Sequence, residues 1–384
     1  MKIGYKILVI GDIYDNHIIR YLCNLKNENS KAVIDVFAYF QKGDIDSRLD
    51  GVINRIYWHI PTTNTIKFYR VFVLAERYKT ELHEISRQTH YDIVNIHFPS
   101  SVIGLITSEL KKLGDTIVIT PWGSDFYRAG KIGRMMLKPL FKRADYICSA
   151  GNRFAKDVKA YFNLPDSKLA YLDIGSETID YISENKNNIS PKQARKELCL
   201  DGDYFITCGY NAHKEQNHLS IIEAISEIRD NLPEKLTLLF PMTYPHDEVY
   251  IRQVKQKAAD KSLHAVFFEK YLDLKTLFLL RQATDMFIHV QSTDANSASV
   301  QEYLLLGKNV VNGSWLRYDE LEKNGIPYYL VDNMESLSKD ILNTYKKGPI
   351  NVAEETFQYI ESYGWKQWIK KWNSFFCKCL IDSR

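Results

Sequence analysis

The sequence predicts an α/β protein with two doubly wound domains. Short apolar runs alternate with helical patterns along the whole chain, which is typical of parallel sheets covered by helices on both faces. The 384 residues exceed one ordinary core, so two domains are expected. Apolar residues make up 45% and charged residues 25% of the chain, as in globular proteins.

The first domain is predicted from five apolar runs, at residues 6–10, 33–37, 92–96, 116–119 and 146–148. Each is short enough to be a buried strand. Helical patterns at residues 101–113 and 152–162 supply connecting helices. This order of elements favours a parallel sheet.

A polar stretch at residues 183–188 predicts the linker between the domains. After it, Ser190, Pro191 and Gln193 have the N-cap, N1 and N3 residue types of a helix start. A second strand series follows at residues 204–208, 236–240, 265–268, 286–290 and 309–311. The second domain therefore begins near residue 186.

Composition excludes several classes of protein. The formal net charge is only +3, and we find no nucleic-acid-binding motif, so no nucleic-acid partner is expected. Six scattered cysteines indicate a reducing cytosol rather than a disulfide or zinc framework. The sequence shows no signal peptide and no apolar run of membrane-spanning length. We expect a cytoplasmic protein.

The segment from Asp294 to Gly307 carries the clearest functional pattern. It joins a predicted strand to an apolar helix through the small residues Ser297, Ala298 and Ser299. A helix N-terminus with accessible N–H groups binds anions, and Glu302 has the chemistry to accept hydrogen bonds from ribose hydroxyls. These parts suit a nucleoside diphosphate. The alternative is an ordinary strand–loop–helix with Ser297 or Ser299 as N-cap.

The same segment resembles the retaining GT-B glycosyltransferases of family 4. Those enzymes carry Glu-x7-Glu, with Gly-Phe-Gly between, and a later glycine before a Val-Val strand. Here Asp294 and Glu302 occupy the carboxylate positions, Gly307 precedes Val310-Val311, and Asn296-Ser297-Ala298 replaces Gly-Phe-Gly. The resemblance implies two Rossmann-like domains facing a central cleft, with Asp294 near the donor sugar.

The polar linker sets the predicted domain limits, and the GT-B resemblance implies where the C-terminal helix packs. Residues 1–185 would form the acceptor-side domain and residues 186–351 the nucleotide-sugar-binding domain, with a C-terminal helix at 352–384 packing back on the first. Three tryptophans, Trp365, Trp368 and Trp372, have helical spacing in that tail and are expected to pack.

A second resemblance covers residues 236–312. The run from Pro241 through Tyr244 to Pro245, followed by a helix, and the later Arg281-Gln282 helix are similar to bacterial 4-acetamido-4,6-dideoxygalactose transferases of enterobacterial common antigen synthesis. Tyr244 is placed to line the nucleotide or sugar pocket. The alternative is a rigid turn with a packed ring.

Two further residues are expected on the donor side. Lys214 follows the first strand of the second domain, where family 4 enzymes carry an Arg and a Lys that neutralise the diphosphate; Tyr210 replaces the Arg. Tyr271 follows another strand, where the family binds the base. The alternative for Lys214 is a solvated loop lysine.

On the acceptor side, Trp122, Gly123 and Asp125 resemble the Trp-Gly-Ser-Asp version of a family 4 turn. Gly123 permits a tight turn, Asp125 has the chemistry to bind sugar hydroxyls, and the Trp122 indole to stack on a pyranose. The alternative is a turn capped by Asp125. His97 ends a strand and His17 follows the first one; each either reaches the cleft or is structural.

Residues 131–143 form a basic amphipathic segment, with lysines and arginines interleaved with apolar residues. Such a helix suits anionic lipid head groups. An ordinary surface helix packed on its own core has the same pattern, so the two readings stay open.

We therefore expect a hexosyltransferase-type glycosyltransferase, cytoplasmic or peripheral at the inner face of the cell membrane. It would move sugar from a nucleoside diphosphate sugar to a lipid-linked or growing glycan in bacterial surface polysaccharide synthesis of the O-antigen or capsule type. Asp125, His97 and Asp294 are the catalytic candidates. No metal or other cofactor is expected. The alternatives are a GT-B nucleotide-sugar epimerase and a non-catalytic GT-B partner module.

Overall fold

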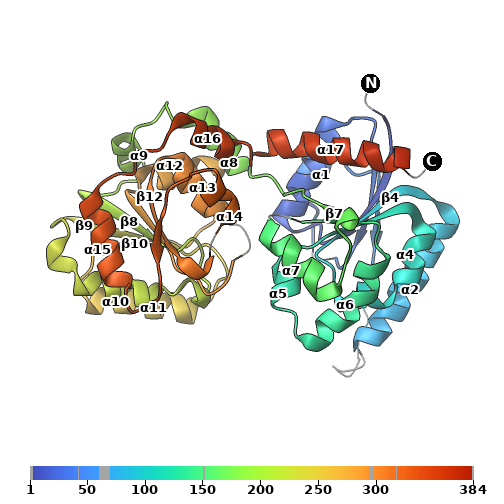
Figure 1. Ribbon diagram of the computed structural model, residues 1–384, viewed down its shortest axis with the longest axis horizontal. Coiled ribbons are helices and arrows are strands. Elements are labelled where there is room, and N and C mark those ends of the chain that lie inside the picture. The colour runs from blue at the N-terminus through green and yellow to red at the C-terminus, as the bar shows by residue number, and fades with distance from the viewer. Residues whose placement is uncertain are drawn as a thin grey trace. The chain divides into compact units, whose positions relative to one another are not determined.

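The computed structural model describes residues 3–41, 43–59, 70–149, 152–294, 297–316 and 318–382. It divides into two units, each a parallel sheet between helices (Figure 1). The first domain comprises Met1–Gly175 and Trp365–Arg384, and the second comprises Ser176–Gly364. The predicted α/β class with two doubly wound domains is confirmed.

The first domain contains a seven-stranded sheet of order β3-β2-β1-β4-β5-β6-β7, with parallel pairing throughout the described strands. Its strands are β1 (Lys6–Gly11), β2 (Val33–Ala38), β3 (Arg55–Trp58), β4 (Tyr91–His97), β5 (Gly114–Thr120), β6 (Tyr146–Cys148) and β7 (Leu169–Ala170). Its helices are α1 (Asn16–Glu28), α2 (Arg70–Gln88), α3 (Ser101–Leu105), α4 (Thr107–Leu113), α5 (Ser124–Tyr127), α6 (Lys131–Arg143), α7 (Asn152–Phe162) and α17 (Trp365–Asp382).

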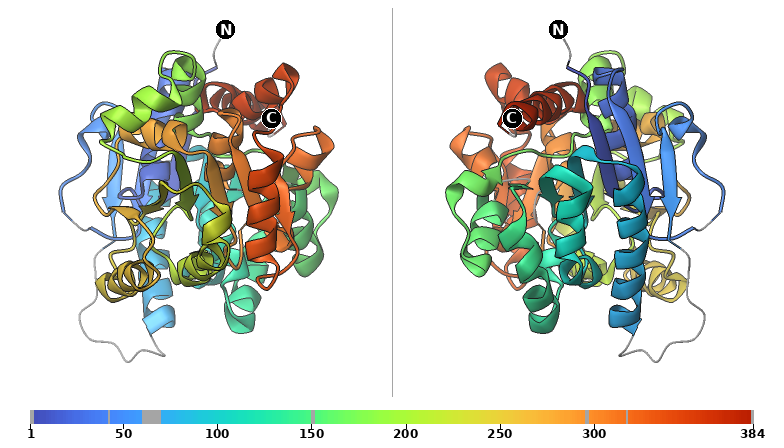
Figure 2. Two further views of the ribbon diagram at one scale, coloured as in Figure 1. Left: turned by 90° about the vertical axis from the view of Figure 1, so that its left-hand side faces the viewer. Right: turned by 90° about the vertical axis from the view of Figure 1, so that its right-hand side faces the viewer.

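The alternation of side chains along β1 explains the two layers of helices. Leu8 and Ile10 are buried in the core that includes α2, α3 and α6, whereas Ile7 and Val9 are buried on the opposite face. That opposite face is covered by α1 and α17, which lie against each other (Figure 2). A strand buried on both faces needs an almost continuous apolar run, which β1 has from Ile7 to Ile10.

The second domain contains a six-stranded parallel sheet of order β10-β9-β8-β11-β12-β13. Its strands are β8 (Tyr204–Cys208), β9 (Leu236–Pro241), β10 (Ala265–Phe268), β11 (Met286–His289), β12 (Asn309–Gly313) and β13 (Tyr329–Val331). Its helices are α8 (Glu177–Asn185), α9 (Pro191–Glu197), α10 (His218–Glu227), α11 (Glu248–Asp260), α12 (Leu274–Ala283), α13 (Ala298–Leu305), α14 (Asp319–Lys323), α15 (Leu337–Lys347) and α16 (Glu354–Glu361).

Each sheet has a topological switch point. The strand order reverses between β1 and β4 in the first domain and between β8 and β11 in the second. Open α/β sheets bind ligands outside the carboxyl ends of their strands at such points. Among the predicted site residues, His17 and His97 belong to the first switch point, and Lys214 and Asp294 to the second.

The domain limits differ from the predicted ones at both junctions. Helix α8 belongs to the second domain, because Ile179 and Ile182 are buried in its core; residues 183–188 are therefore not the linker. Residues 352–364 also stay with the second domain, and only α17 joins the first. There Trp365 and Trp372 are buried.

The structure confirms some of the local predictions from the sequence and corrects others. The capping box of α9 is present, with Ser190 and Gln193 each bonding the other's backbone N–H. The helix predicted at residues 101–113 is instead two helices, because Ile106 leaves the helical conformation and Gly104 packs tightly on the Met136 backbone. Strands β3, β7 and β13 were not predicted.

Candidate functional site

Helix α13 begins at the carboxyl end of β11, where the sequence placed the phosphate site. Ser297 is its N-cap, and the Ser297 hydroxyl accepts a hydrogen bond of 3.4 Å from the Val300 N–H. Ser297 and Ser299 are both buried. Of the replaced Gly-Phe-Gly run, Asn296 lies outside the described residues. The helix has eight residues and supplies the predicted N-terminus.

Glu302 lies in a buried network that the sequence did not reveal. Arg281 from α12 donates from Nε to Glu302 Oε2 at 3.0 Å, from Nη1 to the Tyr303 hydroxyl at 3.0 Å and from Nη2 to Ser299 Oγ at 3.3 Å. The side chains of Arg281 and Glu302 are only 3% and 5% exposed. Burial alone would lower the pKa of Arg281, but its interactions with Tyr303 and Glu302 outweigh burial and raise it. Glu302 is therefore held as a carboxylate with a fixed orientation.

Asp294 lies at the same edge, in the loop after β11. Its Oδ2 accepts a hydrogen bond of 3.0 Å from the Tyr318 hydroxyl and lies 3.5 Å from His289 Nε2. Burial and the charge of Asp294 raise the pKa of Tyr318 well above its usual value, so the phenol is a neutral donor. Two buried residues, Tyr318 and His289, thus lie against the Asp294 carboxylate.

Tyr244 follows β9, at the carboxyl end of a strand of the second sheet. Burial raises its pKa, with a hydrogen bond to Asn211 and the charge of Arg281 acting against that rise. The residue is 53% exposed, and its role in lining the nucleotide or sugar pocket stays a prediction. Tyr271 is 74% exposed, and its role toward the base stays a prediction.

Lys214 lies in a 3-10 turn, Lys214–Gln216, after β8. Its ammonium is 3.3 Å from Asp247 Oδ2, and its side chain is 65% exposed. Exposed ion pairs contribute little, so this one is easily exchanged for a more highly charged anion. Tyr210, which replaces the family arginine, stacks on His289 with ring centroids 5.8 Å apart.

In the first domain, His97 does not fit the predicted role of a base. It has no exposed surface. Its Nε2 lies 2.7 Å from Asn95 Oδ1, and its Nδ1 accepts a hydrogen bond of 3.4 Å from the Trp122 indole. Burial lowers its pKa to about 3. His97 is therefore a neutral residue that orients Trp122.

Asp125 is buried in the turn after β5. Gly123 adopts φ +94°, which suits glycine, and caps α5. The Asp125 carboxylate accepts the Trp122 N–H at 3.0 and 3.1 Å, as the capped-turn alternative requires. Burial raises the pKa of Asp125 to about 7, against the lowering effect of backbone hydrogen bonds. A carboxyl group with a pKa in this range is suited to proton transfer near neutral pH.

The structure brings His17 and Trp122 together. The His17 ring is exposed and meets the Trp122 ring edge to face at 5.3 Å. Phe98, which the sequence did not single out, joins them 6.4 Å from Trp122. Phe98 has φ +51° and is 45% exposed, an uncommon conformation for a bulky residue. These rings form an aromatic surface at the carboxyl edge of the first sheet.

Helix α6 has the predicted two faces. Leu137, Leu140 and Phe141 are buried, whereas Ile132 and Met135 are 71% and 64% exposed. The basic residues Lys131, Lys138, Lys142 and Arg143 are also exposed. No helix in the described part of the chain is long and apolar enough to cross a membrane.

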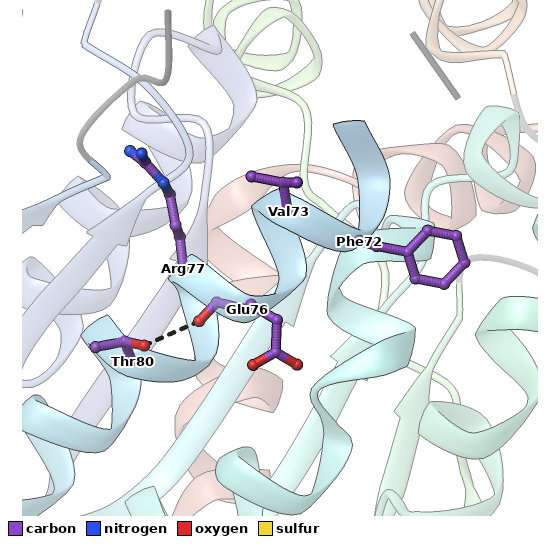
Figure 3. Close-up of a pocket in the computed structure, with 5 residues that line it drawn as sticks. All are labelled: Phe72, Val73, Glu76, Arg77 and Thr80. Carbon is purple, nitrogen blue, oxygen red and sulfur yellow. Dashed lines mark hydrogen bonds between the residues drawn. The ribbon is translucent and has the colours of Figure 1, made fainter. Parts of the chain in front are cut away.

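A shallow surface pocket lies on the outer side of α2, and no predicted site residue lines it. Its lining is a single helix face with Phe72, Val73, Glu76, Arg77 and Thr80 (Figure 3). The charged side chains of Glu76 and Arg77 point in different directions there. We assign no role to this pocket.

Comparison with known proteins supports the fold. Residues 6–150 match the family described as glycosyl transferase 4-like. Comparison with curated protein sequences gave no match.

Three solved structures illustrate the structural likeness. A glycosyltransferase from Rickettsia africae superposes with a TM-score of 0.72 at 14% identity, covering 98% of this chain and 99% of that one. Sucrose-phosphate synthase from Thermosynechococcus elongatus gives 0.73 at 12% identity, covering 97% and 98%. Anabaena HepE, solved with UDP and glucose, gives 0.67 at 14% identity, covering 97% and 100%. The chain thus resembles GT-B glycosyltransferases: it has their fold, and its first domain matches the glycosyl transferase 4-like family.

Proposed function

We propose that this protein is a glycosyltransferase that uses a nucleoside diphosphate sugar. The observation that carries the proposal is the switch point of the second domain, where the N-terminus of α13, Glu302 and Asp294 are grouped at one sheet edge. Phosphate oxygens suit the helix N-terminus, and ribose hydroxyls suit an oriented carboxylate such as Glu302. HepE, of the same fold, was solved with UDP and glucose, which supports this class of donor.

Helix α13 and Lys214 would provide positive potential next to the leaving diphosphate. Negative charge on the diphosphate grows as the glycosidic bond breaks, so donors aimed at it stabilise the transition state. Lys214 would break its ion pair with Asp247 and contact the diphosphate instead. Asp294 would contact the donor sugar, and Tyr244 would line the pocket.

On the acceptor side, Trp122, His17 and Asp125 of the first domain would bind the acceptor sugar. The aromatic surface at Trp122 suits a pyranose face. A lipid-linked acceptor in surface polysaccharide synthesis fits the exposed apolar and basic side chains of α6, which would hold the protein peripherally on an anionic membrane.

Thermal unfolding with UDP, GDP, TDP and their sugar conjugates tests the proposal. A ligand that binds only the folded state raises the unfolding temperature. At a concentration a hundredfold above its Kd, it stabilises the folded state by about 2.7 kcal/mol. We expect one nucleotide class to stabilise the protein. Stabilisation by none of them would contradict the proposal. A donor consumed to a new sugar nucleotide without acceptor would instead indicate an epimerase.

A further inference from the structure

A cluster of buried polar side chains links the core of the first domain to Trp122. Asn95 and His97 lie two residues apart on β4, so their side chains are on the same face of the sheet. Neither has any exposed surface, and Tyr21 of α1, which contacts both, has none either. Buried polar groups are costly unless they form hydrogen bonds. The bonds within this cluster therefore constrain its geometry.

The side-chain amide of Asn95 has one orientation. Its Nδ2 donates to Thr120 Oγ1 at 2.9 Å and to the Val118 carbonyl at 3.4 Å. A carbonyl oxygen only accepts, so the nitrogen of the amide is the atom that faces β5. Asn95 Oδ1 then accepts from the Tyr21 hydroxyl at 2.9 Å and from His97 Nε2 at 2.7 Å. His97 Nε2 therefore carries a hydrogen.

This tautomer decides what His97 offers to Trp122. Burial lowers the pKa of His97 to about 3, so its ring is neutral near neutral pH and has a single N–H group. With that hydrogen on Nε2, Nδ1 is an acceptor, and it accepts the Trp122 indole N–H at 3.4 Å. The other tautomer would bring two N–H groups together, because an indole only donates.

Tyr21 holds the Asn95 amide in place. Its ring contacts His97 at 4.6 Å and Trp372 of α17 at 5.3 Å between centroids. Burial raises the pKa of Tyr21 well above its usual value, so its hydroxyl stays a neutral donor. The Asn95 oxygen thus has a second donor that does not change with pH in the physiological range.

Trp122 is fixed at two points. The Asp125 carboxylate accepts its backbone N–H, and His97 accepts its indole N–H. The rings of His17 and Phe98 lie 5.3 and 6.4 Å from it. Of these contacts, the bond to His97 holds the polar edge of the indole.

We propose that Asn95 is a positioning residue of the acceptor site: its amide selects the His97 tautomer that holds the indole of Trp122. This role rests on the proposed function, in which Trp122 binds the acceptor sugar. Without the Asn95 oxygen, the imidazole is no longer restricted to that tautomer, and the indole loses its fixed acceptor. A ring that is already oriented binds a sugar face at a lower entropic cost.

Spectra of protein labelled with 15N-tryptophan test this role. The chain has six tryptophans, and Trp122→Phe identifies the Trp122 indole signal. The variant Asn95→Leu/Tyr21→Phe removes the amide together with a hydroxyl that would otherwise be left unpaired. We expect its Trp122 indole proton to exchange with solvent about fivefold faster, as for the loss of one neutral hydrogen bond.

Tyr21→Phe alone is the matched control. It keeps the bond between Asn95 and His97, so the Trp122 proton should exchange as in the wild type. An Asn95 with only a structural role would lower the unfolding temperature of the double variant and leave this exchange rate unchanged, which would overturn the inference. If the double variant fails to fold, 15N-histidine spectra of the wild type still decide, because a hydrogen on His97 Nδ1 would contradict the inference.

Sugar binding separates this inference from the proposed function. The methyl α- and β-pyranosides of glucose and galactose serve as probes, and we expect at least one to shift the Trp122 signal of the wild type. The double variant should bind that glycoside about fivefold more weakly, and Tyr21→Phe should bind it normally. If no glycoside shifts the wild-type signal, the acceptor role of Trp122 is wrong, and the role of Asn95 with it. Unchanged affinity in the double variant would overturn only the role of Asn95.

Discussion

At the residue scale, the buried Arg281–Glu302 pair makes Glu302 both a binding candidate and a structural residue. Glu302→Gln should lower nucleoside diphosphate affinity roughly ten- to hundredfold, since a hydrogen bond to a charged group contributes about 1.5–3 kcal/mol. It should also lower the free energy of unfolding by about 3–5 kcal/mol, because Arg281 keeps its charge without its buried partner. Titration calorimetry and urea unfolding measure the two effects.

The matched control separates those effects. In the double variant Arg281→Met/Glu302→Leu, both charges are removed, so stability should return toward that of the wild type. Nucleotide affinity should stay low, because the carboxylate is still missing. Wild-type affinity in this double variant would remove Glu302 from the donor site.

The raised pKa of Asp125 predicts that the activity depends on pH. Its pKa is raised from 3.8 to about 7 by burial, so it is protonated in the folded protein at mildly acid pH. If it accepts a proton from the acceptor, kcat/KM should rise with pH through about 7 and then level off. Asp125→Asn should lose this rise together with most of the activity. A wild-type profile that is flat from pH 5 to 8 would exclude Asp125 as the base.

The raised pKa of Asp125 also makes the free energy of unfolding depend on pH. A raised folded-state pKa favours the protonated carboxyl, so its stabilising contribution is complete below 3.8 and is lost as pH rises through about 7. The free energy of unfolding of the wild type should therefore fall over this range relative to Asp125→Asn. Denaturant titrations at several pH values measure the difference.

At the scale of elements, α6 is where the exposed apolar and basic residues coincide. We expect weak binding to anionic vesicles that decreases with salt, since each basic residue near the bilayer contributes about 1 kcal/mol. Lys131, Lys138 and Arg143 are exposed, so replacing all three with Glu should release the protein. Lys142 is left intact, because its ammonium donates to the Asn163 carbonyl at 2.6 Å. Vesicle sedimentation at low and high salt provides the measurement.

A second variant controls for net charge. Lys192, Lys196 and Lys339 are exposed on helices of the second domain, and their replacement with Glu changes the net charge equally. This variant should still bind vesicles, less strongly than the wild type. Equal losses in the two variants would show that α6 is an ordinary surface helix.

At the scale of the whole molecule, transfer should proceed without a divalent metal. In the proposed function, helix α13 and Lys214 would supply positive potential for the diphosphate. Two Asp-x-Asp pairs do occur in the sequence, Asp44/Asp46 and Asp201/Asp203. Asp46 is paired with Arg48 at 2.8 Å, and Asp201 and Asp203 lie before β8, at the amino end of the strand. Neither pair belongs to the second switch point.

A transfer assay in excess chelator tests this expectation. Most of the wild-type rate should remain if positive charges of the protein itself stabilise the leaving group, as proposed. Loss of the rate in chelator, restored by magnesium or manganese, would mean that a metal ion stabilises the leaving diphosphate.

The sequence by itself determined the parts of the fold that depend on local patterns. Strands such as β1 and β8 are buried on both faces and therefore read as continuous apolar runs, and the α9 capping box lies within four residues. Short strands with mixed composition, such as β3, carry little local signal and were missed. The placement of Trp122, Asp125 and Asp294 after strands follows from the same local reading.

Only the tertiary structure decided which side chains meet. Arg281 and Glu302 are 21 residues apart, His289 and Asn312 are 23 apart, and each pair forms because β11, β12, α12 and α13 are neighbours in the folded domain. His97 shows the same limit: its position at a strand end is local, but its burial depends on α1 and Trp122. Charge compensation and burial depend on contacts between distant segments, and no local sequence pattern encodes those contacts.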